Sequence, residues 1–205
     1  MSKKEPISNS TLETIRMRHS IRQFSDEPVS EEDINTILEA ANQAPSAHNQ
    51  QSWRFVVVQG DKRLELSELV AEKSRDYPKP SSSLLRMAAR SIASSPVTIA
   101  VANTGDLIEH GTDLFKVDRE IAFDFFRTME IQSSAAAVEN LLLAATSLGL
   151  ASVWLGVLFL IKKDVLAFLG EPGGEFMAVI PIGYSSQESS GPSKRSLDYV
   201  VRRLS

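Results

Sequence analysis

The chain of 205 residues contains no cysteine. That absence excludes disulfide bonds, thiolate nucleophiles, cysteine-ligated zinc and iron–sulfur clusters, and it fits the reducing cytoplasm, where we expect the protein to reside. The chain also lacks an excess of positive charge, because 22 lysines and arginines stand against 26 aspartates and glutamates. The net charge of −4 provides no strong positive field for a phosphate backbone, so we expect no nucleic acid partner.

The motifs of several common mechanisms are missing as well. The sequence has no G-x-G-x-x-G after a strand, no G-x-x-x-x-G-K-[ST] and no G-x-S-x-G, which leaves out the usual dinucleotide, P-loop and serine hydrolase sites. His19, His48 and His110 are isolated and lack the H-E-x-x-H spacing, so we expect no metal site. An enzyme without these groups takes its chemistry from a cofactor and supplies binding, orientation and electrostatics.

No segment is a strong candidate for a membrane anchor or a secretory signal. The first ten residues include two lysines but no apolar stretch behind them. Residues 141–161 carry no charge and are long enough to cross a bilayer, but Gly149 interrupts them and favours a core helix that ends there, followed by a buried strand. We therefore expect no membrane association.

Composition and periodicity predict one globular α+β domain over residues 1–205. Hydrophobic residues make up 42% of the chain and charged residues 23%, which are ordinary globular values. Strands are expected at residues 53–59, 97–103, 151–155 and 176–183, and helices at residues 10–18, 30–44, 64–73, 84–93, 117–148 and 163–169. The first helix is expected to begin with a capping box of Ser10 and Glu13, and the second with Ser30 and Asp33. Residues 103–116 are expected to form a loop or lid.

Two segments suggest a partner subunit. The second half of the 117–148 helix is apolar nearly all round, which is typical of a helix buried at depth or between subunits. The tail from residue 185 is polar and then ends in the apolar Tyr199, Val200 and Val201, which cannot bury much against themselves. We expect such a tail to pack on a partner.

Three polar clusters are candidates for a binding site. Arg18, His19, Ser20 and Arg22 lie at the end of the first helix, where arginine forks can bind phosphate oxygens. Taken alone, this cluster is better explained as a basic helix end that pairs with its own carbonyls. The second cluster, in residues 44–53, places Ser46, Asn49 and Gln51 between Pro45 and a strand; its amides can read a heterocycle edge, or it is a polar turn. The third cluster is Lys194 and Arg195 in the tail. These side chains either bind the same anion as the first cluster or keep the tail hydrated.

The sequence resembles the FMN-dependent nitroreductases. The resemblance rests on RHSIRQF at residues 18–24, PVSEEDINTILEAANQAPSAHNQQSWRFVVV at residues 28–58, AAAVENLLLAATSLGLASVWLG at residues 135–156 and VIPIGY at residues 179–184, followed by a basic tail. Residues 64–116 match least. The resemblance implies a mixed, mainly antiparallel sheet flanked by helices, in a homodimer with a long interface helix and an exchanged C-terminal arm.

The resemblance also implies roles for single residues. Arg18, His19, Ser20 and Arg22 would hold the phosphate, ribityl chain and pyrimidine edge of FMN, and Arg22 would stabilise the reduced flavin electrostatically. Pro45, Ser46, Asn49 and Gln51 would form a second loop that reaches the flavin of the other chain. Leu155 and Gly156 would present backbone amides to the flavin, and Lys194 and Arg195 would bind its phosphate. Ser52, and the tail sequence from Ser193 to Ser196, depart from the usual family pattern, which bears on the subfamily.

The function implied is ping-pong hydride transfer from NAD(P)H to flavin N5 and on to a nitroaromatic, quinone or similar small acceptor. Other flavin chemistry on the same fold remains open, namely dehalogenation, enoyl-type dehydrogenation or flavin fragmentation. A non-enzymatic flavin-binding protein is a further alternative, favoured if residues 103–116 cover the flavin and exclude the nicotinamide.

Overall fold

The computed structural model of the protein describes residues 9–115, 118–188 and 190–204. Most of the segment considered as a secretory signal, and residues 116 and 117 at the expected junction of loop and long helix, lie outside the described residues. The elements in chain order are α1 (Ser10–Met17), α2 (Glu31–Asn42), η1 (Ala47–Asn49), β1 (Trp53–Gln59), α3 (Gly60–Lys73), η2 (Ser74–Asp76), α4 (Ser81–Ser94), β2 (Val97–Asn103), α5 (Asp106–Leu114), α6 (Arg119–Ser147), β3 (Ala151–Ser152), η3 (Gly156–Ile161), α7 (Lys162–Phe168), β4 (Glu175–Gly183) and α8 (Leu197–Val200).

The four strands form one sheet in the order β1-β2-β4-β3, and each neighbouring pair is antiparallel. A parallel bridge between Ser20 and Ser152 adds the segment after α1 to the β3 edge, so the sheet is mixed but mainly antiparallel. The predicted α+β class, with a sheet of this kind flanked by helices, is confirmed.

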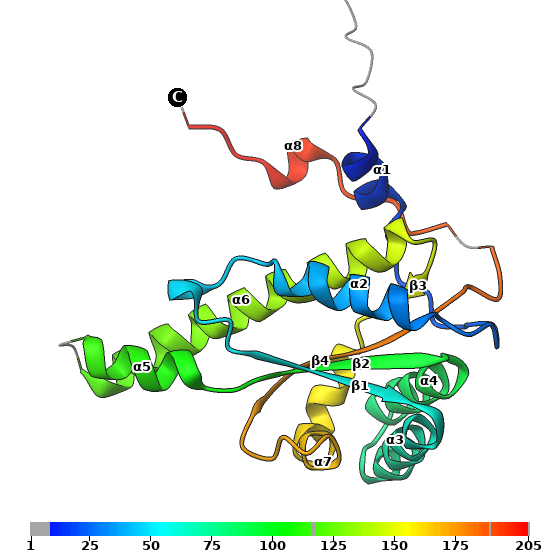
Figure 1. Ribbon diagram of the computed structural model, residues 1–205, viewed down its shortest axis with the longest axis horizontal. Coiled ribbons are helices and arrows are strands. Elements are labelled where there is room, and N and C mark those ends of the chain that lie inside the picture. The colour runs from blue at the N-terminus through cyan, green and yellow to red at the C-terminus, as the bar shows by residue number, and fades with distance from the viewer. Residues whose placement is uncertain (1–8, 116–117, 189, 205) are drawn as a thin grey trace, which may run out of the picture.

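The side chains of β2 show why helices cover both faces of the sheet. Ile99 and Val101 pack in the hydrophobic cluster that includes α2 and α6, whereas Ala100 and Ala102 pack in the cluster that includes α3 and α4. Successive residues of a strand point to opposite faces, so a strand that is buried throughout requires a layer on each side. Figure 1 shows α2 and α6 on one side of the sheet and α3, α4 and α7 on the other.

The two predicted helix starts have different outcomes. Ser30 caps α2 as expected, since its hydroxyl accepts a hydrogen bond from Asp33 N at 3.0 Å and donates one to the Asp33 carboxylate at 2.7 Å. At α1 the expected cap was wrong. Asn9 caps the helix by accepting from the amides of Thr11 and Leu12, and Ser10 is already helical. Asparagine is as good a cap as serine, and here it stands one residue earlier.

The loop predicted for residues 103–116 was also wrong, because Asp106–Leu114 form helix α5. Gly105, with φ of 88°, precedes the helix, and the amide of Leu107 in its first turn donates to Glu130 Oε1 at 3.0 Å. Gly111 lies so close to Phe126 that an added Cβ would be 2.4 Å from the ring. Packing on α6 thus stabilises helix α5, which the local sequence pattern does not predict.

The long helix and the strand after it follow the prediction with shifted ends. α6 runs over 29 residues and ends at Ser147, so the charge-free stretch is divided among α6, β3 and η3. β3 is shorter than expected, but Val153 and Leu155 still donate backbone hydrogen bonds to Pro181 O and Val179 O of β4, at 3.4 and 2.9 Å. In the part of the chain that the structure describes, no helix combines the length and apolar character needed to cross a bilayer.

Candidate active site

The segment after α1 joins the edge of the sheet and thereby places part of the first predicted cluster. Ile21 donates its amide hydrogen to Ser152 O at 3.0 Å, and Ser25 donates to Tyr184 O at 2.9 Å. Ser20 and Arg22, on either side of Ile21, both line a surface cavity of about 540 Å³. Two residues of the predicted cluster therefore share one site.

This cavity, which we call the arginine cavity, holds positive charge without a carboxylate to balance it. Arg22 comes from the segment after α1 and Arg90 from α4, and neither forms an ion pair with another described residue. The remaining lining residues are Ser20, Ile21, Gln23, Met87, Ser91, Ser94 and Gln187. Guanidinium groups among hydroxyls and amides suit a ligand with phosphate or other anionic oxygens.

A smaller and mainly apolar slot of about 140 Å³ adjoins the arginine cavity, because Arg22, Met87 and Ser91 line both. The other residues of this slot are Leu84, Ala88, Val153, Trp154, Leu155, Gly156 and Val157. An apolar slot beside a cationic cavity fits an amphipathic ligand that has a ring system at one end and a charged group at the other.

This slot contains Leu155 and Gly156, which were expected to offer backbone amides to the flavin. Their amides differ in whether they already donate a hydrogen bond. The Leu155 amide donates to Val179 O at 2.9 Å and so already has an acceptor. Gly156 begins the 3₁₀ helix η3, where the first amide has no acceptor within the helix. Of the two amides, the one at Gly156 is available to a ligand.

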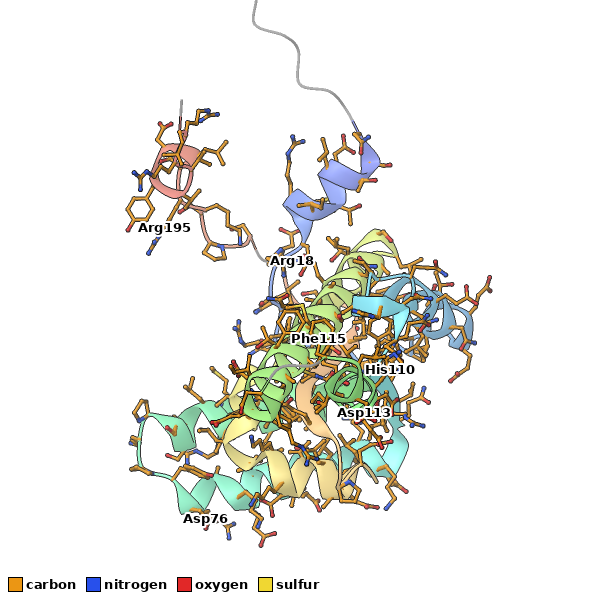
Figure 2. All side chains as sticks on the ribbon, turned by 90° about the vertical axis from the view of Figure 1, so that its left-hand side faces the viewer. Arg18, Asp76, His110, Asp113, Phe115 and Arg195 are labelled. Carbon is orange, nitrogen blue, oxygen red and sulfur yellow. The ribbon has the colours of Figure 1, made fainter. Side chains whose placement is uncertain are left out.

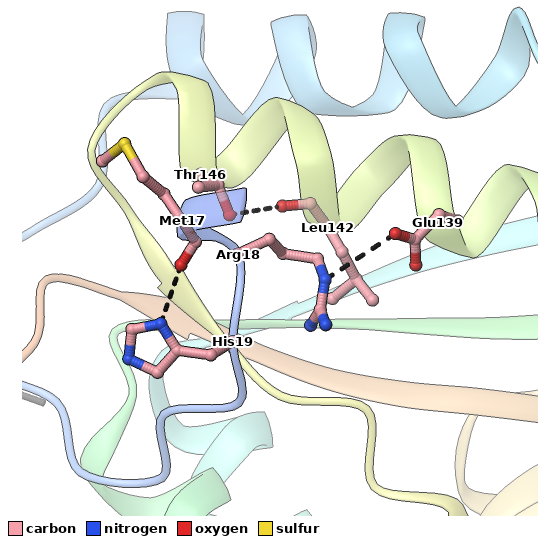
Figure 3. Close-up of polar contacts among 6 residues, drawn as sticks. All are labelled: Met17, Arg18, His19, Glu139, Leu142 and Thr146. Carbon is pink, nitrogen blue, oxygen red and sulfur yellow. Dashed lines mark hydrogen bonds and ion pairs between the residues drawn. The ribbon is translucent and has the colours of Figure 1, made fainter. Parts of the chain in front are cut away.

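Arg18 and His19 precede Ser20 directly but do not line either space. The Arg18 Nε lies 3.7 Å from Glu139 Oε1 on α6, and His19 Nδ1 donates to Met17 O at 2.7 Å (Figure 3). The other ring nitrogen, His19 Nε2, is buried and has no hydrogen-bond partner in the described part of the chain. His19 Nε2 is therefore a buried polar atom without a hydrogen bond, in the residue that precedes Ser20.

Within one chain, the 45–51 loop is not part of this site. This loop carries the predicted site residues Pro45, Ser46, Asn49 and Gln51. The loop leads into Trp53, which pairs with Asn103 at one end of β2. The segment that carries Ser20 lies at the other end, because its bridge partner Ser152 pairs with Ile182, and Ile182 pairs with Val97. The six steps from Val97 to Asn103 along β2 separate these ends by about 20 Å. Within one chain this loop therefore lies at the opposite end of β2 from the arginine cavity.

The basic tail residues also lie outside the cavity. Lys194 and Arg195 are exposed, and the Arg195 guanidinium lies 4.6 Å from the ring centre of Tyr199. Figure 2 shows Arg195 on the tail, apart from the body of the protein, and Arg18 where α1 meets that body. The tail passes the site at Gly191, where an added Cβ would be 2.7 Å from His19 Cβ.

The prediction missed the contribution of α4. Met87, Arg90, Ser91 and Ser94 line the arginine cavity, and Leu84 and Met87 line the slot. Their spacing of three and four residues puts them on one helix face, which was readable in the sequence. The sequence does not show that this face meets the segment after α1.

A buried carboxyl group lies on α6 outside the arginine cavity. Glu130 is 1% exposed, and burial raises the pKa of its carboxyl group above the usual range. The hydrogen bond from the Leu107 amide opposes this rise, while the charges of Asp106 and Glu175 add to it. Among the described residues, no group of three histidines or carboxylates could hold a metal ion.

The structure is thus an α+β fold with a two-arginine cavity beside an apolar slot. The sequence profile of the nitroreductase family matches residues 15–184. The chain therefore belongs to the nitroreductase family.

Relatives of known name agree with this assignment. A protein of Archaeoglobus fulgidus, named as a candidate NADH dehydrogenase/NAD(P)H nitroreductase, is 32% identical over 180 residues, which cover 86% of each chain. A protein of the same name from Methanothermobacter thermautotrophicus is 32% identical over 198 residues, covering 91% of this chain and 81% of its own. The crystal structure of a candidate nitroreductase from Desulfovibrio desulfuricans, in complex with FMN, has a TM-score of 0.71 and 29% identity and covers 97% of this chain and 98% of its own.

Proposed function

We propose that this protein is an FMN-dependent oxidoreductase that takes a hydride from NAD(P)H and, in a second step, reduces a nitroaromatic, quinone or similar small acceptor. The proposal is supported by the family membership and by the FMN complex of a relative that is 29% identical over nearly the whole chain. FMN combines a flat ring system with a phosphate, which is the kind of ligand that the slot and the arginine cavity suit together.

The observation that carries the proposal is the pair of unbalanced arginines beside an apolar slot. In a cavity without carboxylates, an anionic ligand would balance the positive charges of Arg22 and Arg90. These residues therefore fit FMN.

Within the site, Ser20, Arg22 and Arg90 would bind the polar part of FMN, and Leu84, Met87 and Val153 would exclude water from its ring. Bound FMN would supply the two-electron chemistry between nicotinamide and acceptor. The Arg22 guanidinium, which lines both spaces, would favour negative charge on the ring system and so assist reduction. No side chain of this chain need donate a proton.

We further propose a homodimer in which one domain, residues 1–205, forms each subunit. The 45–51 loop would complete the site of the other chain, since it lies at the opposite end of β2 from the arginine cavity of its own chain. The tail supports this arrangement, because Leu197, Tyr199 and Leu204 are 74%, 70% and 84% exposed. Apolar side chains exposed to this degree on a projecting arm are suited to packing on a partner.

The visible spectrum of the purified protein, followed by anaerobic addition of NADH and then NADPH, tests the proposed function. We expect a yellow protein that releases FMN on denaturation and is bleached by at least one nucleotide. Adding a nitroaromatic, a quinone or a halogenated phenol to the bleached protein and following the return of colour identifies the acceptor class. A colourless protein that takes up no added FMN overturns the proposal.

A further inference from the structure

The 45–51 loop has an unusual backbone. His48, Asn49 and Gln51 have φ values of 53°, 54° and 51°, in the left-handed region that side chains other than glycine seldom adopt. Each such residue costs of order 1 kcal/mol or more and persists only where surrounding contacts hold it. The conformation of this loop must therefore be imposed by its neighbours.

Hydrogen bonds within the loop account for part of this constraint. The Gln51 amide donates to Ser46 Oγ at 3.1 Å, and Gln51 Nε2 donates to Asn49 Oδ1 at 3.0 Å. The second bond leaves the Asn49 amide nitrogen and the Gln51 amide oxygen, one donor and one acceptor, without a partner in the described part of the chain. Both side chains are exposed, so this pair is accessible to a ligand on another chain.

Helix α6 supplies the remaining contacts. Ser133 Oγ donates to Met129 O, one turn earlier in the helix, at 2.7 Å and accepts a hydrogen bond from the Ala47 amide at 3.1 Å. Ser133 is only 9% exposed, and its bond with the Ala47 amide is partly buried, which limits competition from water. The Phe126 ring, on the same helix, makes an edge contact with His48 at 6.4 Å between ring centres.

We propose that Ser133 is a positioning residue, whose hydroxyl anchors the strained 45–51 loop so that Asn49 and Gln51 are preset to contact FMN. This inference rests on the proposed function. Ser133 does not line the arginine cavity or the slot and acts only through the loop. Without the anchor, the loop spends less time in the binding conformation, and the apparent affinity falls by that fraction.

The test compares Ser133→Ala with Ser147→Ala in the full chain. Ser147 is a matched control, because its hydroxyl likewise donates to a carbonyl of α6, Ala144 O at 2.8 Å, but has no contact with the loop. FMN affinity is measured by titrating the apoprotein with FMN and following the flavin fluorescence. We expect Ser133→Ala to bind FMN about tenfold more weakly and Ser147→Ala to bind as the wild type does.

Amide hydrogen exchange of the apoprotein gives a readout that needs no FMN. The Ala47 amide is expected to exchange at least tenfold faster in Ser133→Ala while the exchange of the β2 amides stays the same. Ser133→Cys, which keeps the side-chain volume but accepts hydrogen bonds weakly, is expected to repeat both effects and covers the case in which the alanine variant does not fold.

The outcomes separate the two proposals. If the wild type binds FMN and both Ser133 variants bind it equally well, Ser133 has no positioning role even where exchange at Ala47 rises. If exchange at Ala47 is unchanged, Ser133 does not anchor the loop. If the wild type binds no FMN, the proposed function fails first, and the positioning role toward FMN falls with it.

Discussion

Arg22 and Arg90 line one cavity from two different elements, and no carboxylate lines it with them. One comes from the irregular segment beside β3 and the other from α4. Helix α4 also carries Arg86, whose Nη2 bonds to Ser83 Oγ at 3.2 Å and which lines neither the cavity nor the slot. Helix α4 thus carries both a site arginine, Arg90, and a matched control, Arg86.

Arg90→Ala is expected to weaken FMN binding by at least tenfold, since a charge-assisted hydrogen bond contributes about 1.5–3 kcal/mol. Arg86→Ala removes the same charge from the same helix and is expected to leave the affinity close to the wild-type value. Isothermal titration of the apoproteins with FMN measures both. Equal losses in the two variants would mean that net charge, and not the arginine cavity, governs binding.

Arg22→Ala is expected to slow the reduction of bound flavin by NAD(P)H about tenfold or more, because a nearby cation favours the negative charge that reduction brings. Arg22→Lys keeps the charge and is expected to retain more of the rate. Anaerobic stopped-flow absorbance at saturating nucleotide and FMN measures the rate. An unchanged rate in Arg22→Ala would refute the electrostatic role.

Gly111→Ala is expected to destabilise the protein by about 1–3 kcal/mol, because the new methyl group meets the fully buried Phe126 ring. Gly173→Ala is the control, since nothing lies within 4 Å of a Cβ at that position. Urea unfolding gives the free energies of both variants. If Gly111→Ala matches the control, α5 does not pack on α6 as closely as the structure shows.

The free energy of unfolding of Glu130→Gln, relative to that of the wild type, is expected to increase as the pH rises. Burial raises the pKa of Glu130, so the folded state binds its proton more tightly than the unfolded state does. The wild type therefore loses stability from about pH 4.3, the unfolded pKa, up to the folded pKa, while glutamine has nothing to ionise. Urea unfolding between pH 4 and 8 should show this trend, and Glu68→Gln, on an exposed part of α3, should not.

The double variant Leu197→Ser, Tyr199→Ser is expected to weaken the proposed dimer at least tenfold, because burying each side chain contributes about 1.5–3 kcal/mol. Leu64→Ser, on α3, is the control for the loss of an exposed leucine away from the tail. Sedimentation equilibrium gives the dissociation constants. A dimer of wild-type strength in the double variant would show that the arm is not part of the interface.

The sequence determined the elements whose residues repeat at a regular period, and it pointed to the segment after α1 as a binding site. Ser30 caps a helix, and Trp53–Gln59 form a strand, because helix capping and the strand preference of β-branched and aromatic residues are local effects. The family resemblance rested on the same segments. The mixed, mainly antiparallel character of the sheet followed from that resemblance and is confirmed.

Only the tertiary structure decided which side chains share a space. Arg90 joined the site because α4 packs against the segment that carries Arg22, a contact that no local pattern encodes. Helix α5 formed where a loop was predicted, since Gly111 lies against Phe126 and Glu130 accepts from Leu107. The roles of Arg18, Asn49 and Lys194 toward FMN stay predictions. Long-range packing and burial set these outcomes, and they depend on residues far apart in the chain.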